Sequence, residues 1–285
     1  MSMTIEPGEV EAFLSGHEPV REALLCRDGD FVGPWHVTAF LGRGAAGEVF
    51  RTDRPRVAAL KVLARDDEAA RGRFRREALI LEMHPHPVLP RFYGFGEAAG
   101  RPYMAIELLE PLPLPHTDRT VSAYLRKLCE GVALLHRLGL VHRDIKPANI
   151  LCRPGSKDPV LIDLGLVQVD PSYHPAEYSV VDGRLRGVGT PGYSAPEQFL
   201  GGQVSPAADI HALGMLVNEC FGGRLPRCWQ RIVRRATSSI PGQRYATVAE
   251  FARAVHCRHH LRIFSLLVVF TVVTLAAVSL ALILK

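Results

Sequence analysis

"GLVHRDIKPANILC", residues 139–152, places three polar side chains of different chemistry between two apolar runs. Asp144 is an acid, Lys146 follows it by two positions, and Asn149 follows it by five. A charged group surrounded by apolar sequence is costly to bury unless its members are paired with one another. The stretch is therefore either a satisfied structural network or a site, and the rest of the chain decides between them.

Composition indicates a globular protein that is large enough for one large or two small domains. The chain has 285 residues, of which 47% are hydrophobic and 22% charged, and its formal net charge is +5. Lys and Arg are distributed along the sequence rather than gathered in one block, so nucleic acid is not expected as a partner. The six cysteines form no C-x-x-C pair and no zinc-site spacing, which predicts reduced thiols in a reducing compartment.

The segment 263–284 contains no charged residue, and its only polar side chains are serines and threonines. As a helix it would be roughly 33 Å long, which matches the hydrocarbon core of a bilayer. A buried helix of a soluble protein would normally carry a polar stripe. The segment is therefore predicted to be a transmembrane helix that contacts the lipid bilayer.

The flanking charges predict the orientation of this span. Arg253, Arg258 and Arg262 precede it, and only Lys285 follows it. The positive side normally remains in the cytoplasm, so the bulk of the chain is expected there. The acidic N-terminal sequence has no apolar core of a signal peptide. We therefore expect a single-pass, tail-anchored membrane protein.

The residues between the N-terminal extension (1–34) and the predicted span divide into two parts with different secondary-structure patterns. Short runs rich in β-branched and aromatic residues predict strands, with one amphipathic helix among them at 66–83. The strands are expected at 35–42, 47–53, 57–64, 91–97 and 102–110. After Pro111 the pattern is mainly helical, with helices expected at 120–139, 207–223, 228–240 and 247–257 and one buried strand at 159–166.

A glycine-rich turn lies between the first two predicted strands. Gly42, Gly44 and Gly47 have the spacing G-x-G-x-x-G, which on its own is a weak signal. A dinucleotide site would require a helix directly after the glycines, whereas here a strand follows. The backbone N–H groups of such a hairpin can close over phosphates, Lys61 can neutralise them, and Glu77 can hold the Lys61 ammonium. The alternative is that Glu77 is an exposed helix charge of little consequence.

Four short motifs, taken in chain order, decide whether residues 139–152 are a structural network or a site. "VAALK" precedes "HRDIKPAN", which is followed by "DLG" at 163–165 and "APE" at 195–197. Together they resemble the eukaryotic-type (Hanks-type) protein kinase family over residues 35–256, and the architecture resembles that of bacterial membrane-anchored Ser/Thr protein kinases. The resemblance implies an α+β, two-lobed fold, with a small β-rich N-lobe containing one helix and a larger helical C-lobe. The basic stretch and membrane helix, residues 257–285, would follow that domain.

The resemblance also implies a role for each polar residue of the motifs. Asp144 would orient the substrate hydroxyl and accept its proton, and Lys146 would steady the transferred phosphoryl group. Asn149 and Asp163 would hold Mg²⁺ (or Mn²⁺), since carboxylate and amide oxygens are the hard ligands this metal prefers. Phosphoryl transfer depends on positioning and charge neutralisation, which such a set supplies.

ATP would bind between the lobes. Its adenine would lie under Leu41 and Ala59 and above Leu151, with hydrogen bonds from the backbone of the linker 107–109. The complete set of ATP-binding residues implied by the resemblance is Leu41, Gly42, Gly44, Gly47, Val49, Ala59, Lys61, Glu77, Glu107, Leu109 and Leu151.

Further details of the resemblance indicate the substrate class and the scaffold. Lysine two positions after the catalytic acid, together with "GTPGYSAPEQ", is typical of kinases that act on protein Ser/Thr hydroxyls. Ser172 and Ser179 are candidate phosphorylation sites, with ordinary loop residues as the alternative. Asp209 would brace the catalytic loop and Arg244 would pair with Glu197.

Two features of the sequence depart from the family pattern and leave alternative functions open. Leu164 replaces the usual Phe of the metal motif. The chain between Asp209 and Arg244 is too short for the usual substrate-docking helix, so substrates are expected to dock differently from those of the family. The leading interpretation is an active Ser/Thr kinase that also phosphorylates itself, with a homodimer as one possible assembly. A membrane-tethered pseudokinase scaffold is the alternative, although no motif residue is missing. A small-molecule phosphotransferase is disfavoured by the intact "GTPGYSAPE" segment.

Overall fold

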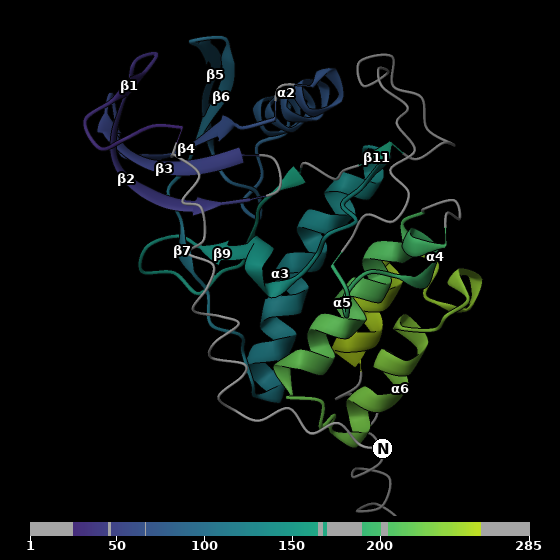
Figure 1. Cartoon of the computed structure of the whole chain (residues 1–285). Coiled ribbons are helices and arrows are strands. Elements are labelled where there is room, and N and C mark those ends of the chain that lie inside the picture. The colour runs from purple at the N-terminus through teal and green to yellow at the C-terminus, as the bar shows by residue number, and fades with distance from the viewer. Residues whose placement is uncertain are drawn as a thin grey trace, which may run out of the picture.

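The computed structural model describes residues 25–44, 47–65, 67–164, 168–169, 190–200 and 205–257. These residues form a β-rich lobe and a helical lobe, which are arranged one above the other in Figure 1. The two-lobed α+β fold expected from the sequence is therefore confirmed.

The upper lobe is built on a six-stranded antiparallel sheet with the order β1-β2-β3-β4-β6-β5. Its bulky apolar side chains, including Trp35, Phe50 and Leu60, are buried in a core of their own. The predicted strand at 102–110 is shorter than expected, because β6 ends at Ile106 and the linker follows. The strands are β1 (Phe31–Val32), β2 (Trp35–Arg43), β3 (Gly47–Arg54), β4 (Ala58–Leu63), β5 (Phe92–Ala98) and β6 (Arg101–Ile106).

Helix α2 (Glu68–Met83) is the single helix of this lobe among the residues that the structure describes. The Asp67 carboxylate caps it by accepting a hydrogen bond of 2.8 Å from the Ala70 N–H. Phe74, Ala78 and Leu81, spaced at i, i+4 and i+7, form its buried face. The apolar pattern thus fixes which side of α2 faces the sheet, and that orientation turns Glu77 inward as well.

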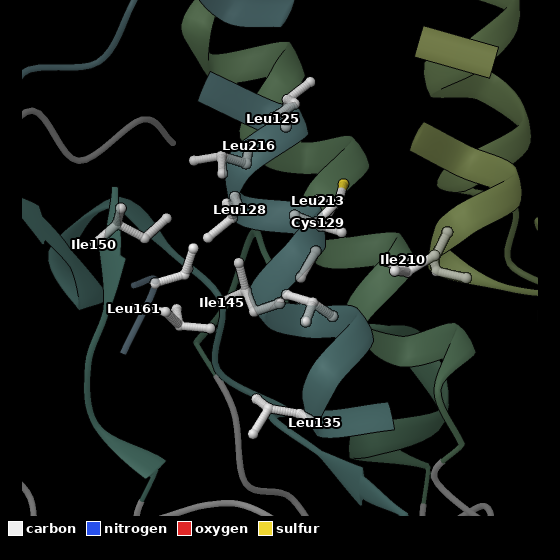
Figure 2. Packing of buried hydrophobic residues seen from close by; sticks show 14 of the residues in the cluster. Leu125, Leu128, Cys129, Leu135, Ile145, Ile150, Leu161, Ile210, Leu213 and Leu216 are labelled. Atoms are coloured by element: carbon white, nitrogen blue, oxygen red, sulfur yellow. The ribbon is translucent and has the colours of Figure 1, made fainter. Parts of the chain in front are cut away.

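The lower lobe is a group of helices around a larger apolar core. Figure 2 shows α3 leucines such as Leu125 and Leu128 meeting Leu213 and Leu216 of α5, and all four are fully buried. Thr117 and Thr120 form a capping box at the start of α3. The helices are α3 (Asp118–Arg137), α4 (Pro196–Phe199), α5 (Ala207–Cys220), α6 (Arg227–Ala236) and residues 248–257, with a 3-10 turn η3 (Pro241–Gln243).

Two small antiparallel sheets hold the "HRDIKPAN" loop at the top of the lower lobe. Strand β8 (Leu140–Val141), which pairs with β11 (Gln168–Val169), precedes the loop. The turn η1 (Pro147–Asn149) and strand β9 (Ile150–Cys152) follow it, and β9 pairs with β7 (Glu110–Pro111) and β10 (Val160–Leu161). The loop is therefore fixed at both ends by backbone ladders.

The segment between α2 and β5 is attached to the lower lobe rather than to the sheet above it. The Leu161 N–H donates a hydrogen bond of 2.7 Å to the carbonyl of Val88. The Val88 side chain presses against α3 at Gly131, where an added Cβ would lie 2.6 Å from Val88 Cγ1. Arg153 Nη2 also donates to the carbonyl of Leu89 at 3.1 Å. The C-terminal end of α2 is thus tied to the lobe beneath it.

The shortness of the chain between α5 and α6 is visible in the fold. Residues 221–226 connect the two helices as turns, and no helix intervenes. Among the described residues, no helix is long and apolar enough to cross a membrane. The predicted span at 263–284 lies outside the described residues, as do the N-terminal residues 1–24.

Candidate active site

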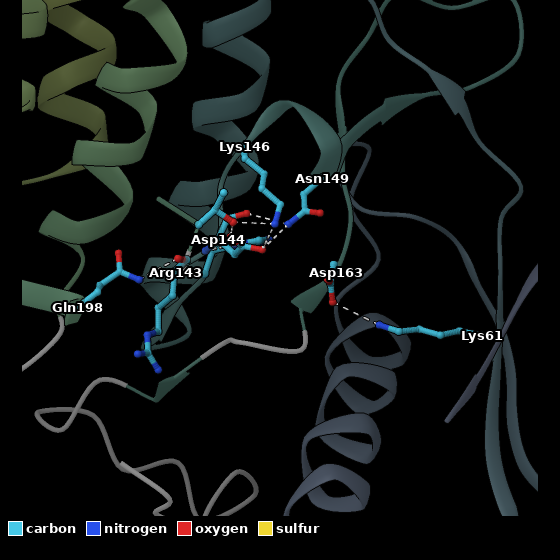
Figure 3. A network of polar contacts seen from close by, with 9 residues as sticks. Lys61, Arg143, Asp144, Lys146, Asn149, Asp163 and Gln198 are labelled. Carbon is cyan, nitrogen blue, oxygen red and sulfur yellow. Dashed lines mark hydrogen bonds and ion pairs between the residues drawn. The ribbon is translucent and has the colours of Figure 1, made fainter. Parts of the chain in front are cut away.

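Lys61, Glu77 and Asp163 meet from three separate elements. Lys61 Nζ on β4 donates to both carboxylate oxygens of Glu77 on α2, at 3.0 and 2.8 Å. The same nitrogen lies 3.3 Å from Asp163 Oδ1, a contact drawn in Figure 3. The Lys61 and Glu77 side chains are only 12% and 3% exposed, whereas that of Asp163 is 42% exposed. The cluster is thus closed on the helix side and open on the Asp163 side.

The charge of Lys61 is secured by these neighbours. Burial alone would lower its pKa, but the carboxylates of Glu77 and Asp163 outweigh burial and raise the pKa above its ordinary value. Lys61 therefore carries a permanent positive charge in a nearly dry environment. Such a charge interacts strongly with an anionic ligand, because little water screens it.

The glycine-rich turn lies directly across the sheet from Lys61. Gly42 pairs with Val49, and Val49 pairs with Lys61, so the three positions form one row over β2, β3 and β4. The Gly44 N–H donates to the carbonyl of Gly47 at 2.8 Å. A Cβ on Gly47 would lie 2.0 Å from the Val62 carbonyl oxygen, so only glycine fits this approach of β3 to β4.

An ion pair supports the base of that turn, and the sequence pattern did not reveal it. Glu48, which is 2% exposed, accepts hydrogen bonds from Arg43 Nε and Nη2 at 2.9 and 2.6 Å. It also accepts a hydrogen bond of 2.7 Å from the Leu25 N–H. Arg43 and Glu48 are cross-strand partners, so only the register of β2 on β3 identifies the pair.

Asp144 is the centre of a second polar cluster, on the lower lobe (Figure 3). Its Oδ2 accepts from Asn149 Nδ2 at 2.9 Å and from Lys146 Nζ at 2.8 Å. Its Oδ1 accepts from the Thr190 hydroxyl at 2.7 Å, and Lys146 also donates to that hydroxyl at 2.8 Å. The carboxylate is 6% exposed and is held in one orientation by three donors. Thr190 was expected only as part of a motif, and its contacts join the segment that precedes "APE" to the "HRDIKPAN" loop.

Asp209, buried in α5, fixes the backbone of the same loop. Its carboxylate accepts hydrogen bonds from the N–H groups of His142 and Arg143 at 2.9 and 2.8 Å. His136 Nε2 contacts it at 2.8 Å. Burial would raise the pKa of Asp209, but these hydrogen bonds and the nearby imidazoles lower it, so the carboxylate stays ionised. Arg143 has a φ of +72°, a costly conformation that this bracing maintains.

Asn149 and Asp163 fit the metal-binding role that the resemblance implies. The amide nitrogen of Asn149 donates two hydrogen bonds to Asp144, one of 2.8 Å to the backbone carbonyl and one of 2.9 Å to the carboxylate. The amide oxygen is therefore directed away from Asp144, as Figure 3 shows. No group of three or more His, Cys, Asp or Glu side chains forms a ready metal site in the described residues. Two protein oxygens suit Mg²⁺, which usually completes its shell with water and phosphate oxygens.

The residues expected around adenine lie on two different sheets. Leu41 and Ala59 belong to the six-stranded sheet, and Leu151 belongs to the small sheet of the lower lobe. Leu41 is 48% exposed, and the side chains of Val49, Leu109 and Leu151 are half-buried. A planar ligand placed between the sheets would cover this apolar surface.

Glu107 takes part in the linker through contacts that the sequence did not suggest. Its carboxylate accepts a hydrogen bond of 3.0 Å from Arg153 Nε and forms an ion pair of 2.9 Å with Arg153 Nη2. Its backbone N–H donates to the carbonyl of Arg91 at 2.9 Å. Arg153 thus holds the linker against β9. No local pattern signals an interaction across 46 positions of sequence.

The scaffold pair expected from the sequence is also present. Arg244 Nη1 and Nη2 bind the two oxygens of Glu197 at 2.6 and 2.8 Å, and Nε donates to the carbonyl of Ser238 at 2.8 Å. Leu164 is 2% exposed, so it fills a buried position despite replacing Phe. The candidate phosphorylation sites Ser172 and Ser179 lie outside the described residues.

The family model of the protein kinase domain matches residues 35–254, which is most of the chain. The chain therefore belongs to the protein kinase family. It is 33% identical over 214 residues to the serine/threonine-protein kinase pkn2 of Myxococcus xanthus and 34% identical over 229 residues to PknL of Mycobacterium bovis. These alignments cover 68% and 73% of this chain, but only 25% and 53% of the relatives.

Among solved structures, the PknI kinase domain of Mycobacterium tuberculosis matches with a TM-score of 0.62. The match covers 82% of this chain and 99% of that domain at 24% identity. At that identity the likeness supports the fold alone.

Proposed function

We propose that this chain is a Ser/Thr protein kinase that transfers the γ-phosphate of ATP to protein hydroxyls, including its own, and is anchored to a membrane. The observation that supports the proposal most directly is the pairing of two clusters. Asp144 with Lys146 and Asn149 forms the first, and Lys61 with Glu77 and Asp163 forms the second. Relatives that match most of the chain are named serine/threonine-protein kinases.

In the proposed reaction Asp144 orients the attacking hydroxyl and receives its proton. The hydrogen bonds from Asn149, Lys146 and Thr190 fix the direction in which the carboxylate points, so a substrate hydroxyl meets a preorganised acceptor. Lys146, 2.8 Å from Asp144 Oδ2, is placed to steady negative charge on the group in transfer. Lysine at this position also favours Ser/Thr over Tyr, as the resemblance implied.

Lys61 and the glycine-rich turn would bind the phosphates of ATP from above. Glu77 keeps the ammonium in place, so Lys61 can contact a phosphate without losing its orientation. Asn149 and Asp163 are the residues that would hold Mg²⁺ or Mn²⁺. When bound, such a metal supplies charge neutralisation on the phosphate oxygens.

The first test uses the full chain with Mg²⁺, labelled ATP and a generic Ser/Thr protein substrate. The matched variant is Asp144→Asn, which keeps the size of the side chain and removes the proton acceptor. We expect the variant to lose at least about 100-fold in transfer rate, since general base catalysis contributes roughly 10²–10⁴-fold. Its thermal shift with ATP should equal that of the parent chain, because Asp144 does not bind the nucleotide.

Full activity in Asp144→Asn would contradict the assignment of the catalytic residue. A parent chain that folds and binds ATP but transfers no label, to itself or to the substrate, would favour the pseudokinase scaffold. Label found on tyrosine alone would contradict the Ser/Thr assignment. Labelling of a catalytically inactive copy by an active one would support transfer within a homodimer.

The membrane proposal rests on the length and purity of residues 263–284 and on the arginines that precede them. It places the kinase domain on the cytoplasmic side. Deletion of 263–285 should move the protein from the membrane fraction to the supernatant after a high-salt wash. A control in which these residues are shuffled, with composition and length unchanged, should remain in the membrane fraction. A truncated chain that still sediments with washed membranes would disprove the anchor.

A further inference from the structure

The positive charge of the molecule is less evenly distributed than the sequence pattern suggested. The chain has a formal net charge of +5, and residues 221–257 alone contribute +6. The remainder of the chain is therefore close to neutral. The charged residues of this segment are Arg224, Arg227, Arg231, Arg234, Arg235, Arg244 and Arg253, with Glu250 as the single acid.

Helix α6 presents most of these arginines on one side. Its apolar residues Trp229, Ile232 and Val233 are buried in the lower lobe. Arg227, Arg231 and the pair Arg234 and Arg235 are exposed on the helix surface. The helix is thus amphipathic, with an outward face that is strongly basic.

Three of these side chains have no structural task within the described part of the chain. Arg235 pairs with Glu250 at 2.9 Å and covers the ring of Tyr245, so it holds the lobe together. Arg227, Arg231 and Arg234 enter no ion pair with any described residue. Their mutual repulsion is unfavourable, and an anionic partner would relieve it.

The basic face surrounds an open hollow of about 1120 Å³. Its lining combines arginines of α6 with hydroxyl-bearing residues, several apolar side chains and the end of the last described helix, residues 248–257. The lining includes Arg227, Arg231, Arg234, Ser238, Ser239 and Cys257. Guanidinium and hydroxyl groups around one concave surface are the donors that bind phosphate oxygens.

The position of the hollow along the chain identifies the nearest phosphate-bearing surface. Cys257 lines it, and the predicted span begins at Ile263, six positions later. Six residues reach at most about 20 Å even when fully extended. If residues 263–284 cross a bilayer, the hollow is held close to the headgroups throughout the life of the protein.

We propose that the basic face formed by Arg227, Arg231 and Arg234 binds anionic phospholipid headgroups and holds the helical lobe against the membrane that anchors the chain. This inference rests on the proposed anchor, which supplies the proximity. Basic side chains near an anionic surface attract it within about one Debye length, roughly 8 Å at physiological salt, so the tether makes a modest patch effective. The consequence is a fixed orientation of the kinase domain relative to the bilayer.

The test measures the accessibility of individual arginines. The full chain is placed in vesicles of phosphatidylcholine alone, or of phosphatidylcholine with phosphatidylglycerol, and is treated with phenylglyoxal. Mass spectrometry of peptides then gives the modification rate at each arginine. We expect Arg227, Arg231 and Arg234 to react severalfold more slowly on the anionic vesicles, and high salt to remove the difference. Arg51, exposed on β3, should react equally on both.

A variant pair makes the inference specific. Arg231→Gln with Arg234→Gln should abolish the protection of Arg227, whereas Arg51→Gln with Arg54→Gln, which removes the same charge from the upper lobe, should leave it intact. Equal reactivity of the α6 arginines on both vesicles would overturn the inference and leave an acidic protein as the remaining candidate partner.

The anchor and the basic face fail in distinguishable ways. A chain that floats with neutral vesicles but shows no α6 protection on anionic ones keeps its anchor and contradicts the basic-face inference. A chain that floats only with anionic vesicles, with the α6 arginines protected, contradicts the anchor and supports the basic face. A chain that floats with neither contradicts both.

Discussion

Two buried ion pairs of this molecule have the same chemistry and opposite designs. Lys61 with Glu77 and Arg244 with Glu197 are both cation–carboxylate pairs with two short contacts. Arg244 is also bonded to the carbonyls of Ala207 and Ser238, so its guanidinium is enclosed by protein. Lys61 instead has Asp163 as a third neighbour, 42% exposed, on its open side.

The exposure of a neighbouring group distinguishes the Lys61 pair, which can take part in a binding site, from the Arg244 pair, which is structural. An enclosed pair has no capacity for a further ligand, so its role is to join the "APE" helix α4 to the region before residues 248–257. A pair with an exposed anionic neighbour retains a charge that a ligand can use. Burial and pairing alone therefore do not identify catalytic residues, and the open side of the cluster does.

The largest effect expected from this comparison is the loss of activity in Lys61→Met. The variant removes the charge that would meet the phosphates, so transfer should fall by roughly 10²–10³-fold. Stability should fall as well, because burial already raises the pKa of Glu77 and the loss of Lys61 leaves this carboxyl without its cation. Initial rates and thermal melting measure the two quantities. Lys127→Met, which removes a surface lysine of α3, should leave both unchanged.

The second effect is a loss of stability in Arg244→Met. Removing one member of an enclosed pair leaves Glu197 buried without its partner, which costs about 3–5 kcal/mol. Denaturant unfolding of the full chain in detergent gives this value. Arg126→Met breaks an exposed pair with Glu130 on one helix and should cost about 0.3–0.5 kcal/mol. The two pairs should instead differ in activity, because only the Lys61 pair is open to a ligand. A loss of transfer rate in folded Arg244→Met as large as that in Lys61→Met would remove the distinction between the pairs.

The smallest effect is a pH dependence that originates beside the enclosed pair. Burial, and then the charge of Arg244, lower the pKa of His211 from 6.5 to about 4, with Glu197 opposing the shift. The unfolded chain therefore binds a proton between these pH values that the folded chain does not bind. Stability should fall as the pH decreases from about 6.5 towards 4. In His211→Gln that part of the decrease should be missing, and parallel stability curves for the two proteins would contradict the assignment.

The sequence predicted most elements because their signals are local. The apolar spacing of Phe74, Ala78 and Leu81 defines α2, and the glycines between two β-branched runs define the hairpin. Asp144, Lys146 and Asn149 could be predicted as one cluster because they are at most five positions apart. Contacts that join distant segments, such as Arg153 with Glu107 and Thr190 with Asp144, depend on how those segments pack in three dimensions. A linear pattern contains no record of that packing.

The attachment of Val88 to the lower lobe fixes one end of α2, so a tilt of this helix would move its other residues relative to the sheet. Its C-terminal end, at Met83, is tied through the following segment to α3 and β10, while Glu77 lies six residues away along the helix axis. At 1.5 Å per residue, a rotation of about 20° about the tied end would carry Glu77 about 3 Å. That displacement equals the length of its contact with Lys61, so a small tilt of one helix is sufficient to connect or disconnect the phosphate-binding charge.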